Sequence, residues 1–259
     1  MKQKLRIVKV GGNVINHPEA LESFLADFSA LKGLNILVHG GGKRASQMVS
    51  NLGLVPKMVE GRRITDAATL EVVTMVYAGL LNKNITASLQ QKGCNALGLS
   101  GADANCIQAH KRAVTDIDYG FVGDVDAVNV QSISVFLQAG MVPVFCALTH
   151  DQKGQLLNTN ADTIAASLAT GLSATYDVEL LYAFEKNGVL RDVNDDHSVI
   201  ASINSASYQV LKDTGVISEG MLPKMENCFE ALQKGVAKVL LGNPTLLRNK
   251  EQPFTTLTL

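Results

Sequence analysis

Residues 34–46, LNILVHGGGKRAS, join a short apolar run to three glycines and a lysine. The apolar run predicts a buried strand over 34–38, and residues 45–52 predict a helix. A glycine-rich turn between a strand and a helix presents backbone N–H groups and the positive end of the helix dipole, which suit an anion. A tight turn without a ligand has the same sequence, so this stretch alone leaves both interpretations open.

The glycine run differs from the phosphate-binding loop of P-loop proteins. The pattern G-x-x-x-x-G-K-[ST] requires a glycine where the chain has Leu37 and a serine or threonine where it has Arg44. The dinucleotide pattern G-x-G-x-x-G is also absent. An anion held here would therefore contact the backbone in a geometry other than that of a P-loop.

Composition narrows the class of protein. The 259 residues, 46% of them hydrophobic, are enough to bury the core of one large domain or two small ones. A net charge of −1 gives no basic excess for a nucleic-acid partner. The most apolar stretch, 135–148, is interrupted and too short to span a bilayer, and the N-terminal apolar run is too short for a signal peptide. We therefore expect no membrane partner.

The cysteines and histidines of the sequence do not have the spacing of a metal-binding site. Four scattered cysteines without a C-x-x-C pair argue against a zinc site or a disulfide framework and suit a reduced cytoplasm, where we expect the protein to be located. His39 is expected to pack or to form hydrogen bonds rather than bind a metal. The segment from Asp192 begins like a calcium loop, but His197 replaces the required glycine and Ile203 the closing glutamate, so it predicts a polar turn.

Short apolar runs alternate with helical patterns, which is typical of an α/β fold with a parallel sheet. The long segment 65–91 predicts one helix with Thr65 as N-cap. Segments 55–64 and 107–128 predict hairpins over the sheet edge. We expect one continuous sheet with two lobes that meet near residue 170. The predicted strands are 5–10, 34–38, 95–99, 141–147, 178–183 and 236–241; the other predicted helices are 18–32, 45–52 and 162–169; the core-facing residues of the long helix are Leu70, Val73, Tyr77, Leu80 and Leu81.

A second glycine pair, Gly11-Gly12, also ends a strand, and Lys9 lies within that strand. The carboxyl ends of neighbouring parallel strands line one crevice, so the two glycine turns are expected to face that crevice together. An inward Lys9 would suit an anionic partner. The alternative is a strand end from which the amine reaches water.

Charged residues occur at the start of two predicted helices. Asn160 is a candidate N-cap, and Asp162 in the first turn suits the helix dipole, although its carboxylate would also suit two lysines. Lys224 follows Pro223 in the first turn of another helix, where a cation opposes the dipole. This unfavourable placement indicates function, and the alternative is a solvated lysine.

The ordered motifs resemble those of the N-acetylglutamate kinases in the amino-acid kinase family. No single motif is decisive, but the ordered set differs from relatives that act on aspartate, uridylate or carbamate. The resemblance implies a three-layer α/β sandwich, with a central mainly parallel sheet flanked by helices and with edge β-hairpins. The motifs are Lys9-Val10-Gly11-Gly12, His39-Gly40-Gly41-Gly42, Glu60-Gly61-Arg62-Arg63-Ile64-Thr65, Asn82-Lys83, Gly98-Leu99-Ser100-Gly101 with Asp103, Gly120-Phe121-Val122-Gly123-Asp124-Val125, Asn158-Thr159-Asn160-Ala161-Asp162, and Gly220-Met221 with Lys224.

The resemblance implies ATP-dependent phosphorylation of the side-chain carboxylate of an N-acyl-L-glutamate, a step of arginine biosynthesis. Lys9 and Lys224 would stabilise the charge of the transferring phosphoryl group, and Asp162 would organise both amines. Such a reaction needs positioning and charge neutralisation more than covalent catalysis. Because the acceptor carboxylate is already ionised, no general base is required, and Mg²⁺ on the ATP phosphates completes the charge balance.

The resemblance also assigns the lobes, residues 1–170 to the acylglutamate acceptor and residues 171–259 to ATP. Gly41 and Gly42 would donate N–H groups on the acceptor side, while Arg63 and Asn158 would bind the α-carboxylate. The implied nucleotide contacts are Gly11 and Gly12 at the γ-phosphate, together with Glu185, Gly188, Leu190 and Ser218.

The chain departs from the family pattern in the nucleotide segment. A serine-aspartate usually precedes Gly-(Ile/Val)-Leu, whereas residues 184–190 are FEKNGVL, and the C-terminal segment 242–259 lacks the usual glycine-threonine. These departures leave a non-catalytic ligand sensor with the same fold as an alternative. The presence of Lys9, Asp162 and Lys224 argues against it.

Extra basic residues beside the acceptor motifs leave two alternatives for the acyl group on the glutamate nitrogen. Lys43 and Arg44 follow the glycine run, and Arg62 precedes Arg63. They are either solvated surface charges or the binding site of a second carboxylate, as on an N-succinyl rather than an N-acetyl group. The resemblance further implies a homodimer through the helix at 65–91. Because few residues precede the first strand, we do not expect an arginine-regulated hexamer.

Overall fold

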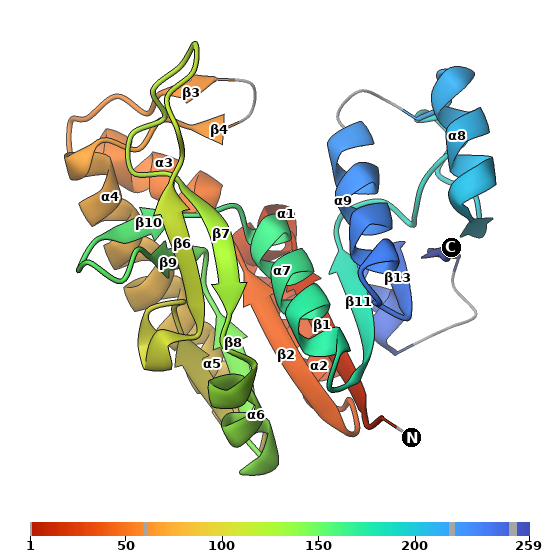
Figure 1. The fold of residues 1–259 in the computed structure, drawn as a ribbon, viewed down its shortest axis with the longest axis horizontal. Coiled ribbons are helices and arrows are strands. Elements are labelled where there is room, and N and C mark those ends of the chain that lie inside the picture. Colours follow the sequence, from red (N-terminus) through yellow and green to blue (C-terminus); the bar gives the residue numbers. More distant parts are fainter. Residues whose placement is uncertain (1, 60–61, 218–220, 249–252) are drawn as a thin grey trace. The chain divides into compact units, whose positions relative to one another are not determined.

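The computed structural model describes residues 2–59, 62–217, 221–248 and 253–259 (Figure 1). The chain has the predicted mixed α/β fold, with a large, mainly parallel central sheet flanked by helices. It divides into two compact units, Met1–Ile36 with Ala165–Leu259 and Leu37–Ile164. The assignment of substrates to lobes 1–170 and 171–259 stays a prediction. Among the described helices, none has both the length and the apolar character that crossing a membrane requires.

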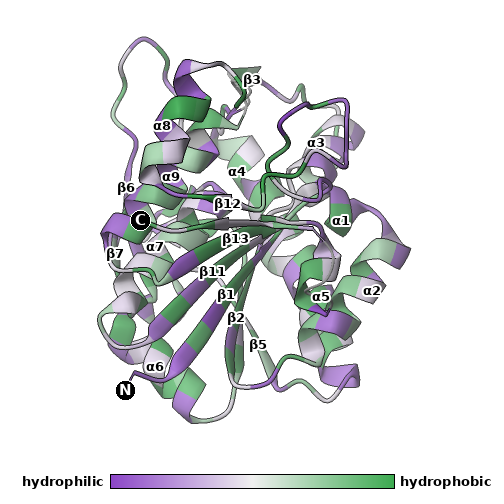
Figure 2. Ribbon diagram, turned by 90° about the vertical axis from the view of Figure 1, so that its right-hand side faces the viewer, coloured by the Kyte–Doolittle hydropathy of each residue, from purple (hydrophilic) through white to green (hydrophobic). Residues whose placement is uncertain are grey.

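The first unit, Met1–Ile36 with Ala165–Leu259, is built around strand β11. Its residues 178–183 are buried on both faces, as expected for a strand between two parallel neighbours. The register aligns Lys9 of β1 with Tyr182 of β11. Figure 2 shows α2 and α7 on opposite faces of β1 and β11. The described strands follow the order β12 (Ser202–Ile203), β14 (Thr255–Leu257), β13 (Lys238–Gly242), β11 (Asp177–Ala183), β1 (Lys4–Val10); the helices are α1 (Gly12–Asn16), α2 (Pro18–Ser29), α7 (Ala161–Ser173, which begins in the second unit), α8 (Ser205–Asp213), α9 (Leu222–Gln233) and a 3₁₀ turn, Pro244–Leu247.

The second unit, Leu37–Ile164, combines parallel strands with a mixed four-stranded sheet and a two-stranded antiparallel hairpin. Both predicted hairpins are confirmed, since β3 pairs with β4 and β6 pairs with β7 in antiparallel register. Figure 1 shows β6 and β7 as long neighbouring strands. The parallel strands are β2 (Leu34–His39), β8 (Val142–Phe145) and β5 (Ala96–Leu99); a second sheet contains β10 (Leu156–Asn158), β9 (Leu148–His150), β6 (Ile107–Lys111) and β7 (Gly123–Val128); the short hairpin is β3 (Met58–Val59) and β4 (Arg62–Arg63); the helices are α3 (Gly42–Asn51), α4 (Ala67–Thr74), α5 (Asn82–Gln91), α6 (Val130–Gln138) and a 3₁₀ turn, Asp103–Asn105.

The predicted helix over 65–91 differs from the structure in two ways. Its N-cap is Asp66 rather than Thr65, because the Asp66 carboxylate accepts a hydrogen bond from the Thr69 N–H at 2.8 Å. Between α4 and α5, Met75–Leu81 forms a π-helix, labelled η1. A π-helical turn contains more residues than an α-helical turn and rotates the side chains that follow it. Leu80, predicted to face the core, is consequently 38% exposed.

A buried carboxylate stabilises the amino ends of the parallel strands in the first unit. The Glu179 carboxylate lies 2.7 Å from Lys4 Nζ, 2.8 Å from Lys238 Nζ and 3.4 Å from Arg6 Nε, and its side chain is only 8% exposed. Burial raises the pKa of the Glu179 carboxyl, but the ammonium groups of Lys238 and Lys4 lower it by more, so the net pKa is below its usual value. One carboxylate of β11 therefore balances three cations from its two neighbouring strands, β1 and β13.

We predict that Glu179→Gln lowers the free energy of unfolding by about 1–3 kcal/mol at pH 7, because it leaves three cations without their counter-charge. Since the folded pKa is depressed, the stabilisation is complete above the usual value of 4.5 and is lost as the pH falls through the folded pKa. Urea denaturation at pH 7 and below pH 4 should show the difference shrinking in acid. Glu230→Gln, which breaks an exposed ion pair with Lys234, is the control and should change little. A pH-independent difference would contradict the electrostatic explanation.

Candidate active site

The glycine turn after β2 passes close to the π-helical segment of the second unit. A Cβ atom on Gly41 would overlap Leu81 Cδ1 and lie 2.9 Å from Tyr77 Cδ1, so only glycine allows the backbone to come this near. α3 begins at Gly42, and no described side chain caps it. The first N–H groups of a helix have no partner within the helix, so those of α3 suit an anion.

Arg63 holds this turn from the side. Its Nη2 donates to the Gly42 carbonyl at 2.9 Å and to Ser46 Oγ at 2.7 Å. The residue is 7% exposed, and Nη1 is buried without a hydrogen-bond partner among the described residues. Buried polar groups are normally hydrogen-bonded, so a buried guanidinium nitrogen without a partner indicates that a ligand supplies the acceptor. A carboxylate is the acceptor that fits the planar guanidinium best. Burial raises the pKa of nearby Tyr77 despite the Arg63 charge, so its hydroxyl stays neutral beside the turn.

Asn158 is connected to Arg63 through Thr65. Asn158 Nδ2 donates to Thr65 Oγ1 at 2.9 Å, and that hydroxyl donates to the Arg63 carbonyl at 3.3 Å. The Asn158 N–H donates to the Phe121 carbonyl, and the Phe121 N–H donates to the Thr65 carbonyl. The four residues expected at the acceptor, Gly41, Gly42, Arg63 and Asn158, therefore belong to one hydrogen-bonded frame within the second unit.

His39 supports the glycine turn from inside the core. Its Nδ1 lies 2.8 Å from the Gly40 carbonyl, and its Nε2 lies 3.1 Å from Asn82 Nδ2, which also donates to the Val144 carbonyl. The carbonyl can only accept and the amide nitrogen can only donate, so Nδ1 carries the proton and Nε2 accepts. Burial lowers the pKa of His39 to about 4. Its expected role in packing and hydrogen bonding is confirmed.

Asn160 begins α7 as the sequence predicted. Its Oδ1 accepts from the N–H groups of Asp162 and Thr163, at 2.7 and 3.3 Å, which is the pattern of an N-cap. Asp162 is therefore in the first turn of α7, within the second unit. The role of its carboxylate toward Lys9 and Lys224 stays a prediction.

Lysines and glycines gather around one end of β11 in the first unit. Residues paired in a sheet point to the same face, so Lys9 and Tyr182 share a face. The Gly11 N–H donates to the Ala183 carbonyl at 2.8 Å, and a Cβ on Gly11 would lie 3.6 Å from Phe184. Lys224, in the first turn of α9, places Nζ 4.8 Å from the centroid of the Tyr182 ring.

The predicted nucleotide segment forms part of a pocket in this unit. Gly188 fits tightly, since a Cβ there would lie 2.6 Å from Thr255 Oγ1, which accepts a hydrogen bond from the Val189 N–H. Glu185 is exposed and does not line the pocket. Ser218 lies outside the described residues. The pocket is lined by Lys186, Gly188, Val189, Leu190, Val193, Val216, Ile217 and Met221.

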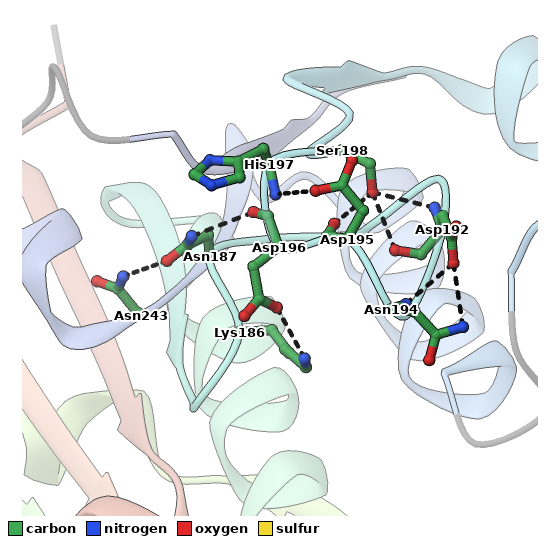
Figure 3. A network of polar contacts seen from close by, with 9 residues as sticks. All are labelled: Lys186, Asn187, Asp192, Asn194, Asp195, Asp196, His197, Ser198 and Asn243. Carbon is green, nitrogen blue, oxygen red and sulfur yellow. Dashed lines mark hydrogen bonds and ion pairs between the residues drawn. The ribbon is translucent and has the colours of Figure 1, made fainter.

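Figure 3 shows the polar network that replaces the expected serine-aspartate pattern. Lys186 Nζ donates to the Asp196 carboxylate at 2.8 Å, and Asn187 Nδ2 donates to the Asp196 carbonyl at 3.3 Å. The carboxylates of Asp192 and Asp195 accept from backbone N–H groups two residues later. These carboxylates thus close turns, and the predicted polar turn is confirmed.

Residues 4–243 match the amino acid kinase family. The chain belongs to this family. It is 54% identical to the acetylglutamate kinase of Phocaeicola vulgatus over 93% of this chain and 94% of that protein. It is 55% identical to the acetylglutamate kinase of Bacteroides fragilis (strain ATCC 25285), over 93% of this chain and 92% of that one. Among solved structures, smu.665 from Streptococcus mutans UA159 superimposes with a TM-score of 0.76 at 26% identity, over 98% of both chains.

Three aromatic residues lie beside the candidate site of this family member, although their sequence pattern was not interpreted in that way. Tyr77 was expected only in the core, but it borders Gly41 and Gly42. Tyr182 and Phe184 contact Lys224. Tyr182 and Phe184 are two residues apart at the end of a predicted strand, so their side chains point to the same face of the sheet. This spacing is the signal that would have identified them.

We predict that nitrogen NMR of His39 shows a neutral ring, protonated on Nδ1, between pH 5.5 and 8, because its pKa is lowered to about 4. An unfolded histidine titrates near 6.5, so the stabilisation from this site is complete above that pH and is lost as the pH falls toward 4. His39→Gln assigns the signal. Titration of the ring near pH 6.5 would contradict the buried, neutral state.

Proposed function

We propose that this amino acid kinase family member transfers the γ-phosphoryl group of ATP to the side-chain carboxylate of N-acetyl-L-glutamate, forming an acyl phosphate in arginine biosynthesis. The observation that carries the proposal is the buried Nη1 of Arg63 beside the glycine turn, which has no hydrogen-bond partner among the described residues. The identity of 54–55% to acetylglutamate kinases over most of the chain supports it.

The acceptor binds through its two carboxylates. Arg63 Nη1 donates to the α-carboxylate, which removes the desolvation penalty of that nitrogen, and Asn158 contributes a second polar contact. The side-chain carboxylate lies at the N–H groups of Gly41 and Gly42, where the α3 dipole stabilises negative charge. This carboxylate is ionised at neutral pH and attacks without a general base.

On the phosphoryl side, Lys9 and Lys224 neutralise the charge that spreads over the transferring oxygens, and Asp162 holds both amines in place. Gly11 and Gly12 place backbone close to the γ-phosphate, and the pocket with Gly188 and Leu190 takes the nucleoside. Glu185 and Ser218 remain proposed nucleotide contacts. The described residues contain no cluster of three metal-ligating side chains, so Mg²⁺ would be held mainly by phosphate oxygens and water, where it neutralises phosphate charge.

We also infer a cytoplasmic homodimer. The supporting feature is apolar surface on the 65–91 region, where Met75 is 56% and Leu80 is 38% exposed. Burying this surface between two copies would remove it from water. Sedimentation equilibrium of the purified chain measures the association directly, and a monomer at all concentrations would exclude the homodimer.

A coupled ADP-release assay with glutamate, aspartate, N-acetylglutamate and N-succinylglutamate tests the function. We expect turnover with the N-acyl-glutamates, and kcat/KM highest for the N-acetyl form. Lys43, Arg44 and Arg62 favour the alternative, an N-succinylglutamate kinase, and a higher kcat/KM for the succinyl form would establish it. Binding of an acyl-glutamate without turnover would indicate a ligand sensor instead.

Lys9→Ala and Lys224→Ala should each lower kcat by roughly 10²-fold or more, because each removes a charge that stabilises the transition state. Steady-state kinetics with N-acetylglutamate and ATP measure this. Lys234→Ala, which removes an exposed lysine of the same unit, is the control. An effect confined to KM would be inconsistent with the assigned roles.

Arg63→Lys should raise KM for N-acetylglutamate by roughly 10- to 100-fold and leave KM for ATP within about twofold, because lysine cannot keep the hydrogen bond to Gly42 while also binding a carboxylate with planar geometry. Arg248→Lys, a charge-conserving change at an exposed arginine, is the control. A larger change in KM for ATP than for the acceptor would contradict the acceptor role of Arg63.

A further inference from the structure

Two aromatic rings border the ammonium group of Lys224 in the first unit. Lys224 Nζ lies 4.8 Å from the centroid of the Tyr182 ring and 5.9 Å from that of Phe184. Tyr182 is 1% exposed and fixed within β11, between β1 and β13. Phe184 follows the strand directly, and its backbone and Cβ lie against Gly11. The rings therefore connect the glycine pair, β11 and the lysine.

The first turn of α9 is an electrostatically unfavourable place for the Lys224 ammonium group, and nearby aromatic rings would stabilise it there. The amino end of a helix carries a partial positive charge, which repels a cation in the first turn. An aromatic ring presents negative potential on its face and attracts an ammonium group within about 6 Å of its centroid. A ring carries no net charge, so it attracts the lysine without cancelling the charge that the lysine offers to a phosphoryl group.

We propose that Tyr182 and Phe184 form an aromatic cradle that positions the Lys224 ammonium for phosphoryl transfer. They act through Lys224, so both are positioning residues rather than catalytic ones. The inference rests on the proposed kinase function and adds a specific task for the segment at 184–187, which departs from the serine-aspartate pattern. Because Lys224 acts on the transition state, weakening the cradle lowers kcat and leaves KM for both substrates nearly unchanged.

Stepwise fluorination of Phe184 tests the cradle. Site-specific incorporation of mono-, di- and trifluorophenylalanine weakens the negative potential of the ring face while nearly preserving its size. We expect log kcat to fall steadily along the series, by about tenfold in total, with each KM within about twofold. Phe184→Leu should lower kcat by a similar factor, and Phe184→Tyr, which keeps the ring, should restore it.

Two controls separate electrostatics from packing. The same series in the Lys224→Ala background should be flat, because the partner cation is absent. Fluorination of Phe229, which lies on the same helix and stacks on Tyr208, should leave kcat unchanged. A flat series with Lys224 present, or an equal slope without it, would overturn the proposal while leaving the kinase function intact.

A measurement independent of turnover separates the two proposals. The rings should shift the Cε protons of Lys224 upfield of those of exposed Lys234 in proton NMR, and Phe184→Leu should move them back. Absence of the upfield shift overturns the cradle whatever the activity. A clear shift in a protein that does not phosphorylate N-acetylglutamate would support the cradle's geometry and contradict the proposed function.

Discussion

The guanidinium of Arg63 joins the short β3–β4 hairpin to the glycine turn through the Gly42 carbonyl and Ser46. The turn comes this close because Gly41 has no side chain that would meet Tyr77 and Leu81. One nitrogen of the same guanidinium is left buried without a partner among the described residues. A buried donor without an acceptor costs free energy. A bound carboxylate would accept its hydrogen bond and remove that cost.

The parallel strands were predictable because a strand covered on both faces appears as a short, continuous apolar run, as in 178–183 and 34–38. The C-terminal strand β14 was missed, since its three residues, TTL, are too few to show an alternating pattern. The buried Thr255 is polar, and its hydroxyl accepts a hydrogen bond from the Val189 N–H. The helical segment over 65–91 was predicted with nearly its correct ends, but the π-helical turn in its middle was not predicted. Its π-helical segment lies against the glycine turn, a long-range contact that local sequence does not encode.

Glycines and an arginine in a fixed order were enough to identify Gly41, Gly42, Arg63 and Asn158 as neighbours, while their roles toward an acceptor stay predictions. The surroundings of Lys224 and the nucleotide segment were less predictable from the sequence. Lys224 was identified because its charge opposes the helix dipole. Phe184, one of the two rings beside its ammonium group, was noted only as part of a departure from the family pattern. The nucleotide segment was also predicted from the pattern, but Glu185 does not line the pocket, while Lys186 lines it and pairs with Asp196.

A thermodynamic cycle tests whether Arg63 binds the α-carboxylate of the acceptor. Calorimetry would compare the binding of N-acetylglutamate and its α-carboxamide to the wild-type protein and to Arg63→Gln. We predict that the wild type binds the carboxylate at least about tenfold more tightly than the amide, as expected for a charge-assisted pair, and that the variant nearly loses this preference. Equal affinity of the wild type for both ligands would show that Arg63 does not bind the α-carboxylate.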